Sequence, residues 1–260
     1  MCSSDLHWPG GLDPNTICFT VDVEWAAPEV LADLQRLFDE HGIRATFFVT
    51  HAGVDTPGHE RGLHPNFRRN SDLYRGLSSS AAALTDEEVH THIVSGTLAF
   101  APEAKGLRTH SLYYDSTLLP LYRRLGLEYD CSYQLPLVPG LRPFWKQHDI
   151  VEIPTYYADH FDLMTGATGL DPARLALDRP GLKVFDFHPN IVFINAGSNA
   201  QYLASKSFYH DPERLLAARQ PGRGVRSFLL DLLAHVSTRG LPVATVGEVN
   251  VHWRGMPKWT

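Results

Sequence analysis

The chain has 260 residues, of which 43% are hydrophobic, so it is long enough to bury one large core. Its 23 basic and 29 acidic residues give a net charge of −6. Proteins that bind nucleic acid or anionic membranes need a basic patch, and the basic residues here are scattered. These two classes are therefore excluded, and we expect a single domain spanning residues 1–260.

Cysteine usage and the terminal sequence indicate the compartment. Cys2, Cys18 and Cys131 are too few and too widely spaced for a disulfide framework or a thiolate metal site. The first residues, MCSSDLHWPGG, contain neither a basic segment nor an apolar segment of the kind found in secretory signals. No apolar run is long enough to span a membrane. We therefore expect a cytoplasmic protein without membrane insertion.

The first elements in chain order are a strand, a helix and a strand. The apolar, β-rich run TICFTVDV predicts a strand at 16–23. Residues 28–42 have apolar side chains at 30, 31, 34, 37 and 38, one face of a helix that begins at Pro28 and stops at Gly42. IRATFFVTH predicts the second strand at 43–51. The glycines and proline of GHERGLHPNF (58–67) then predict a loop, with neither helix nor strand.

The alternation continues to the end of the chain. Thr85 followed by Glu88 is a capping-box pattern that opens a helix. The other expected elements are short strands in 107–112, 128–133, 149–157, 181–189 and 241–246, and helices in 116–126, 211–219 and 224–240. The Gly, Asn and Ser content of 189–224 suggests a long loop that caps a pocket. Repeated strand–helix alternation indicates a parallel α/β sheet, and seven or eight strands favour a single-domain barrel over an open sheet.

Polar side chains repeatedly fall where a predicted strand ends, which is the end that carries the site in parallel α/β folds. They are Asp22 and Glu24, Arg108 and His110, Asp159, and His188. Each has a structural alternative: the two acids at 22 and 24 can interact with the dipole of the following helix. A histidine at a strand end can equally be satisfied by backbone groups.

One combination of these residues predicts a hydrolytic metal site. Glu24 offers an oxygen, and His64 and His110 offer imidazole nitrogens, which together suit Zn²⁺. Three protein ligands leave a position for a water, whose pKa the metal lowers toward neutrality. Asp22 is then free to act as general base.

The other residues of the predicted site would control the proton transfers of the reaction. Arg108 can hold Asp22 ionised through a forked pair, and His188 is the natural acid for a leaving amine. Asp159 can orient His188. The sequence contains no GxSxG elbow, no P-loop and no GxGxxG, so serine-hydrolase, kinase and Rossmann interpretations have no support.

Five segments carry a resemblance to a known family. TVDVEW, ATFFV, HERGLHPNF, LRTHSL and FDFHPN, in this order, resemble the motifs of the polysaccharide deacetylases, the NodB-homology or carbohydrate esterase 4 superfamily. LHPNF and RTHSL resemble the WbmS-like branch, which is associated with bacterial surface-polysaccharide (O-antigen) gene clusters. The resemblance covers roughly 16–246. It implies a deformed (β/α)₇ barrel, a divalent metal, and removal of an N-acetyl or similar acyl group from a sugar or glycan precursor.

The resemblance also assigns roles to residues of this chain. The matches are Asp22 with the catalytic base, Glu24 with the metal-binding acid, His64 with the first metal histidine, Arg108 with the arginine that tethers the base, His188 with the catalytic acid, and Asp159, in competition with Asp162, with the acid that tunes that histidine.

Two positions depart from the family pattern. Arg68 stands four residues after His64, where the family has its second metal histidine, and a guanidinium cannot bind a metal. The substitute is either His110, which we favour, or His59. Glu24 stands where the family normally has Asp.

These departures keep other hypotheses open. The chain can be a metal-dependent deacetylase, a catalytically silent carbohydrate-binding member of the fold, or an amidase acting on non-sugar C–N bonds. Zn²⁺ is the expected ion, although Co²⁺, Ni²⁺ or Fe²⁺ suit similar ligands. The sequence makes no prediction of the oligomeric state.

Overall fold

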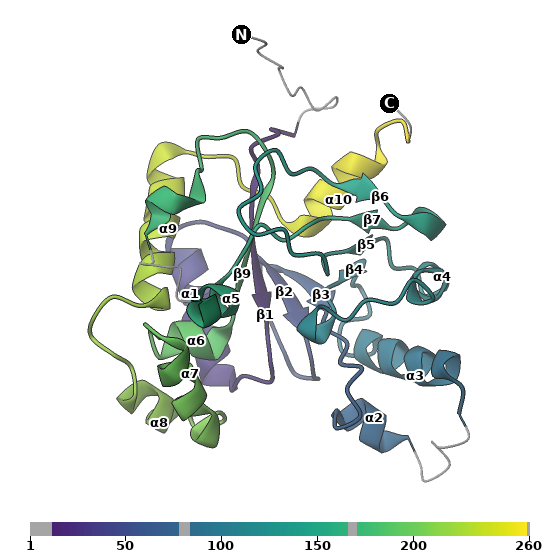
Figure 1. The fold of residues 1–260 in the computed structure, drawn as a ribbon, viewed down its shortest axis with the longest axis horizontal. Helices are drawn as coiled ribbons and strands as arrows, with labels where there is room; N and C mark the ends of the chain where they lie inside the picture. The colour runs from purple at the N-terminus through teal and green to yellow at the C-terminus, as the bar shows by residue number, and fades with distance from the viewer. Residues whose placement is uncertain (1–11, 78–83, 166–170, 259–260) are drawn as a thin grey trace.

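The computed structural model describes residues 12–77, 84–165 and 171–258 (Figure 1). These residues build one strongly curled sheet in the order β6-β7-β5-β4-β3-β2-β1-β9-β8, and every neighbouring pair is parallel except β6 with β7. The strands are β1 (Ile17–Asp22), β2 (Thr46–Val49), β3 (Glu60–Leu63), β4 (Gly106–Leu107), β5 (Tyr129–Asp130), β6 (Phe144–Trp145), β7 (Val151–Glu152), β8 (Tyr157–Ala158) and β9 (Lys183–Phe187). The expected α/β class is confirmed, but the described residues form nine strands instead of seven or eight, and one edge pair is antiparallel.

Helices connect the strands and cover the sheet, and in Figure 1 α1, α6 and α9 lie beside β1 and β9. The α-helices are α1 (Pro28–Glu40), α2 (Asp72–Gly76), α3 (Asp86–Leu98), α4 (Leu118–Arg124), α5 (Asp159–Thr165), α6 (Pro189–Phe193), α7 (Asn199–Ser205), α8 (Pro212–Ala217), α9 (Val225–Arg239) and α10 (Val246–Arg254). Short 3₁₀ turns are η2 (His110–Leu112), η3 (Gln147–Asp149), η4 (Pro172–Leu175) and η5 (Lys206–Phe208).

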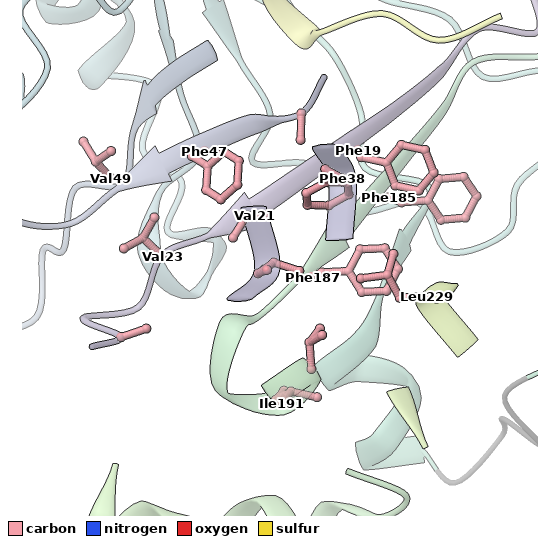
Figure 2. Close-up of a cluster of buried hydrophobic side chains, with 14 of the residues drawn as sticks. Phe19, Val21, Val23, Phe38, Phe47, Val49, Phe185, Phe187, Ile191 and Leu229 are labelled. Carbon is pink, nitrogen blue, oxygen red and sulfur yellow. The ribbon is translucent and has the colours of Figure 1, made fainter. Parts of the chain in front are cut away.

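The alternation of side chains along β1 explains the two faces of the sheet. Successive residues of a strand point to opposite faces. Phe19 and Val21 point outward into the main hydrophobic core, where Phe19 packs against Phe38 of α1 and Phe185 of β9 (Figure 2). Cys18 belongs to a second apolar cluster, together with residues of β5, β7, β9 and α10 such as Tyr129 and Val246. Thr20 and Asp22 point to the same inner face as Cys18. This face of β1 is therefore apolar at its beginning and polar at its end.

The segment 151–158 closes the sheet on itself. It contains β7, which pairs with β5, and β8, which pairs with β9 at the other end of the strand order. Between them Thr155 N donates to Tyr133 O at 2.8 Å, and Tyr156 N donates to Val184 O at 2.8 Å. The segment predicted as one strand at 149–157 therefore contains β7 and the start of β8. It links the two ends of the sheet, which curls into a deformed barrel.

Local signals placed the early elements correctly. Helix α1 begins at Pro28, and its buried side chains are at the predicted positions 30, 31, 34, 37 and 38. The capping box of Thr85 and Glu88 is formed at the start of α3. In both cases the signal lies within a few residues to a few helical turns of sequence, so it can be recognised without any distant contact.

The loop predicted at 58–67 is wrong in its first half, because Glu60–Leu63 forms β3 in the middle of the sheet. Its sequence, ERGL, does not alternate apolar and polar residues, because two of its residues, Glu60 and Gly62, are fixed by contacts with distant parts of the chain. Glu60 accepts from Thr46 Oγ1 at 2.6 Å and from Tyr129 OH at 2.8 Å. Gly62 is required by space, since a Cβ there would lie 2.6 Å from the ring of Phe48.

Two later predictions are also wrong. The strand expected at 241–246 is reduced to one bridge between Val243 and Ile17, and Val246 already starts α10, whose capping box pairs Thr245 with Glu248. The long loop expected at 189–224 is mostly helical: α6 and α7 were not expected, whereas α8 confirms the helix expected at 211–219. Part of this segment nevertheless borders the cleft described below, as expected.

The remaining expectations concern the chain as a whole. Cys18 and Cys131 are buried free thiols. Cys2 and the first eleven residues, on which the expectation about a signal rests, lie outside the described residues. In the described part of the chain, no helix combines the length and apolarity that a membrane crossing needs.

Candidate active site

The site begins where β1 ends at Asp22. Glu24 and Trp25 follow with left-handed φ angles of 50° and 56°, a strained conformation that in non-glycine residues concentrates at functional sites. The strand therefore does not continue past Asp22. The turn instead brings both carboxylates to one imidazole: His64 Nδ1 lies 3.6 Å from Asp22 Oδ1, and His64 Nε2 lies 3.2 Å from Glu24 Oε1.

Glu24, His64 and His110 converge from three different segments. Glu24 Oε1 is 3.2 Å from His64 Nε2 and 2.7 Å from His110 Nδ1, and the three ligand atoms all lie within 4.8 Å of one another. Burial favours protonation of Glu24, but hydrogen bonds from His110 and His64 outweigh it and hold its pKa well below 4.5. An ionised carboxylate facing two imidazole nitrogens is a donor set that fits Zn²⁺ or a related divalent ion in place of the two shared protons.

His59, the alternative third ligand, and Arg68, which stands at the family's second histidine position, both lie outside this cluster. His59 sits before β3, at the opposite end of that strand from His64. Its Nδ1 accepts from Ala45 N at 3.2 Å, and its ring packs on Phe47. The alternative in which His59 is the third ligand therefore does not fit the structure. Arg68 donates to Ser111 Oγ at 2.8 Å, next to His110 in the chain.

Arg108 is buried at the centre of the polar end of the barrel and is 0% exposed. It follows β4 and donates from Nη1 to Asp22 Oδ1 at 2.9 Å and to Asp186 Oδ1 at 2.7 Å. Nη2 donates to Thr155 Oγ1 at 3.0 Å. Burial alone would raise the pKa of Asp22, but the charges of His64, Arg108 and His188 hold it below 3.8. The predicted contact of Arg108 with Asp22 is present, but through a single nitrogen instead of a fork, because Nη2 binds Thr155.

Asp186 is a site residue that the sequence reasoning missed. It lies in β9, two residues before His188, so both side chains point into the barrel. Burial and the neighbouring charge of Asp22 raise its pKa to about 7, against the opposing effect of Arg108. The available signal was the charged residue in the apolar run KVFDF, since a buried strand places an acid only where a partner exists.

His188 and Asp159 form the second charged pair of the site. Asp159, the first residue of α5, accepts from His188 Nδ1 at 2.7 Å and from His188 N at 2.8 Å. Burial lowers the pKa of His188, but the charge and hydrogen bond of Asp159 outweigh this and raise it to about 10. Asp162 instead accepts from Tyr157 OH at 3.1 Å. Of the two competing acids, only Asp159 contacts the histidine.

A further histidine adjoins this pair. The ring of His160 lies 4.6 Å from that of His188, nearly perpendicular to it. Burial and the neighbouring charge of His188 lower the pKa of His160 to about 4. His160 is therefore neutral at pH 7, and its backbone N–H donates to Asp159 Oδ1 at 2.6 Å, the oxygen that also binds His188. Sequence reasoning did not single it out, because nothing local marks which face of α5 meets the site.

An open cleft of about 600 Å³ gives access to the metal candidates, and Glu24 and His110 form part of its wall. This volume is within the range of sites that bind small molecules. Asn66, Arg68, Tyr202 and Lys206 line other parts of it. Asp22, Asp186 and His188 are not among the lining residues. Their ligand atoms lie within 4.8 Å of one another, and Asp22 Oδ1 lies 3.6 Å from His64 Nδ1.

Comparison with known proteins identifies the family. A model of the WbmS-like polysaccharide deacetylases matches residues 19–206, most of the chain. The chain belongs to the WbmS-like polysaccharide deacetylase family. The resemblance inferred from its five motifs is thereby confirmed.

Solved structures agree with this family. One, from Bordetella bronchiseptica, is described as a polysaccharide deacetylase (WbmS) involved in O-antigen biosynthesis; it is 30% identical, has a TM-score of 0.72, and the match covers 84% of this chain and 90% of that one. A structure from Mycobacterium smegmatis, described as a polysaccharide deacetylase, is 16% identical with a TM-score of 0.55 and coverage of 96% and 93%, which shows the common fold alone. No curated protein matches the chain.

Proposed function

We propose that this deacetylase removes an N-acetyl or similar acyl group from a sugar or surface-polysaccharide precursor in a metal-dependent reaction. The observation that carries the proposal is the convergence of two sets of groups at one end of the barrel. Glu24, His64 and His110 present a three-donor set. Beside them lie a carboxylate held ionised and an imidazole held protonated, within 4.8 Å of each other.

Glu24, His64 and His110 would hold the divalent metal, for which Zn²⁺ is the expected ion. When bound, such an ion supplies Lewis-acid activation of water and of the acyl carbonyl. The strained backbone at Glu24 supports the assignment, because the turn is what brings its carboxylate to the two histidines.

The protein residues then divide the proton transfers. Asp22, kept ionised and oriented by Arg108, takes a proton from the attacking water. His188, kept protonated by Asp159 on Nδ1, gives the proton on its other nitrogen, Nε2, to the departing amine. The C–N bond breaks, the acyl group leaves as a carboxylic acid, and the sugar keeps a free amine.

The test combines metal content with acyl release. We expect near-stoichiometric metal in protein purified without added metal or a nickel column, and much less in His64→Ala and His110→Ala. His59→Ala is the matched control, since this histidine packs on Phe47 and is expected to leave the metal in place. Acetate released from a panel of N-acetylated sugars reports the reaction, and circular dichroism checks that each variant is folded.

The other outcomes select the competing hypotheses. If the wild type takes up no metal even with zinc supplied, the metal-dependent mechanism is rejected and the carbohydrate-binding alternative stands. If metal binds and non-sugar amides are hydrolysed while no N-acetyl sugar is, the chain is an amidase for other C–N bonds. If His110→Ala retains its metal, the third ligand is a different residue.

A further inference from the structure

The charges lining the cleft carry a second inference, which rests on the proposed function and concerns the substrate class. Five charged side chains lie in its wall: Glu24, Arg68, Asp72, Arg75 and Lys206. Glu24 is engaged by the two histidines, and Arg75 donates to Asp72 at 2.5 Å. Two positive charges remain.

Arg68 and Lys206 form no ion pair with any carboxylate in the described part of the chain. They reach the cleft from different segments: Arg68 follows β3, and Lys206 begins η5 after α7. The chain as a whole has a net charge of −6. Two unpaired cations therefore line one cleft in a protein whose net charge is negative. They make the wall of the cleft positive beside the proposed metal ligands.

Both cations are held by neutral contacts that leave donors available. Arg68 gives one N–H to Ser111 Oγ at 2.8 Å, and its backbone N–H binds Asn66 Oδ1 at 3.0 Å. A guanidinium has five N–H groups in a planar fork, so a pair remains for a carboxylate or phosphate. The ammonium of Lys206 lies 4.9 Å from the centre of the Tyr202 ring, which places it against the wall without neutralising it.

We propose that the acyl-sugar substrate carries an anionic group, a carboxylate or a phosphate, that binds Arg68 and Lys206 while its N-acyl group faces Glu24 and His110. This gives Arg68 a function at the position where the family resemblance led us to expect a metal histidine. The anion would contribute to binding, and the sugar amide would remain the reacting group.

Binding is measured by calorimetry in a His188→Gln background, in which turnover is not expected. The probes are N-acetylglucosamine, its 6-carboxylate analogue and its 1-phosphate. We expect at least one anionic probe to bind about tenfold more tightly than the neutral sugar at low salt, with the preference shrinking in 0.5 M NaCl because screening shortens the range of charge interactions. The carboxylate and phosphate arms distinguish the two sources of charge.

Substitutions distinguish the effect of a direct contact with the anion from the effect of the net charge of the protein. Arg68→Gln and Lys206→Gln are expected to lower the anionic preference several-fold each, and Arg68→Lys to retain part of it. Arg69→Gln is the matched control, because it removes the same charge from the next residue, which does not line the cleft. Metal content is followed in every variant, since Arg68 contacts the residue next to His110.

The proposal is overturned if neutral and anionic probes bind alike, if none binds, or if Arg69→Gln lowers the preference as much as Arg68→Gln. Failure of the hydrolase hypothesis looks different. Arg68-dependent binding of an anionic sugar without acetate release by the wild type would retain the anion site and reject the deacetylase. Equal kcat/KM for neutral and anionic sugars would retain the deacetylase and reject the anion site.

Discussion

Replacing Asp159 by Asn removes the charge that keeps His188 protonated, while preserving the size of the side chain and one acceptor oxygen. The pair is buried: the side chain of Asp159 is 0% exposed and that of His188 is 9% exposed. Asp159 is the largest influence raising the His188 pKa from 6.5 to about 10, ahead of Asp186 and Asp22, and burial opposes it.

The size of the effect follows from the cost of removing a buried charged partner, about 3–5 kcal/mol. This corresponds to a fall of about 2–4 pH units in the His188 pKa. The pKa of His188 in the variant then lies at about 6–8, so at pH 9 its imidazole is largely neutral. Because a general acid contributes about 10²–10⁴-fold, we expect kcat at this pH to fall by about 10²-fold, with the alkaline limb of the profile moving from near pH 10 toward neutrality.

The assay is an NMR titration of the histidine ring protons from pH 5 to pH 10.5, in parallel with the pH profile of kcat. Asp162→Asn is the matched control, since this neighbouring acid on α5 contacts Tyr157 rather than His188. A wild-type His188 that titrates near 6.5, or one whose pKa is unchanged in Asp159→Asn, would refute the reasoning.

The same pair predicts a pH dependence of stability. The folded pKa of His188 is raised above the unfolded value of 6.5, so its contribution is fully present below pH 6.5 and lost as pH rises toward about 10. The difference in unfolding free energy between wild type and Asp159→Asn should therefore be larger at pH 6 than at pH 10. An equal difference at both pH values would contradict the ion pair.

Two further variants test the barrel interior. Arg108→Gln leaves Asp22 and Asp186 without their cation, so we expect the free energy of unfolding to fall by about 3–5 kcal/mol at pH 8, measured by urea denaturation. The loss should be smaller at pH 5, because the uncompensated carboxyl groups can then be protonated; an equal loss at both pH values would argue against this account. Gly62→Ala places a Cβ 2.6 Å from the ring of Phe48 and should cost about 1–3 kcal/mol, seen as a lower Tm.

Matched controls exist for both variants. Arg36→Gln removes an arginine whose side chain is 54% exposed and paired on the surface of α1; exposed pairs contribute less than about 1 kcal/mol. Gly76→Ala adds a Cβ that meets nothing within 4 Å. If either control were as destabilising as its partner variant, burial and close packing would not be the cause.

Features that are encoded locally could be predicted from the amino-acid sequence. The apolar runs of β1, β2 and β9, the buried face of α1 and the capping box at Thr85 each depend on residues a few positions apart. Strand ends in a parallel fold meet at one edge. This rule was enough to select Asp22, Glu24, Arg108 and His188 as candidates.

Which of these candidates contact one another could not be predicted from local patterns. Glu24 and His110 are 86 positions apart, and Arg108 and Asp186 are 78 apart. Their contacts depend on strand register and on the closure by 151–158, and neither leaves a local pattern. The same reason explains why β3 was not predicted. Glu60 and Gly62 are chosen for contacts with Thr46, Tyr129 and the ring of Phe48, and not for a preference for β-structure. Long-range pairing, not local preference, therefore completes this site.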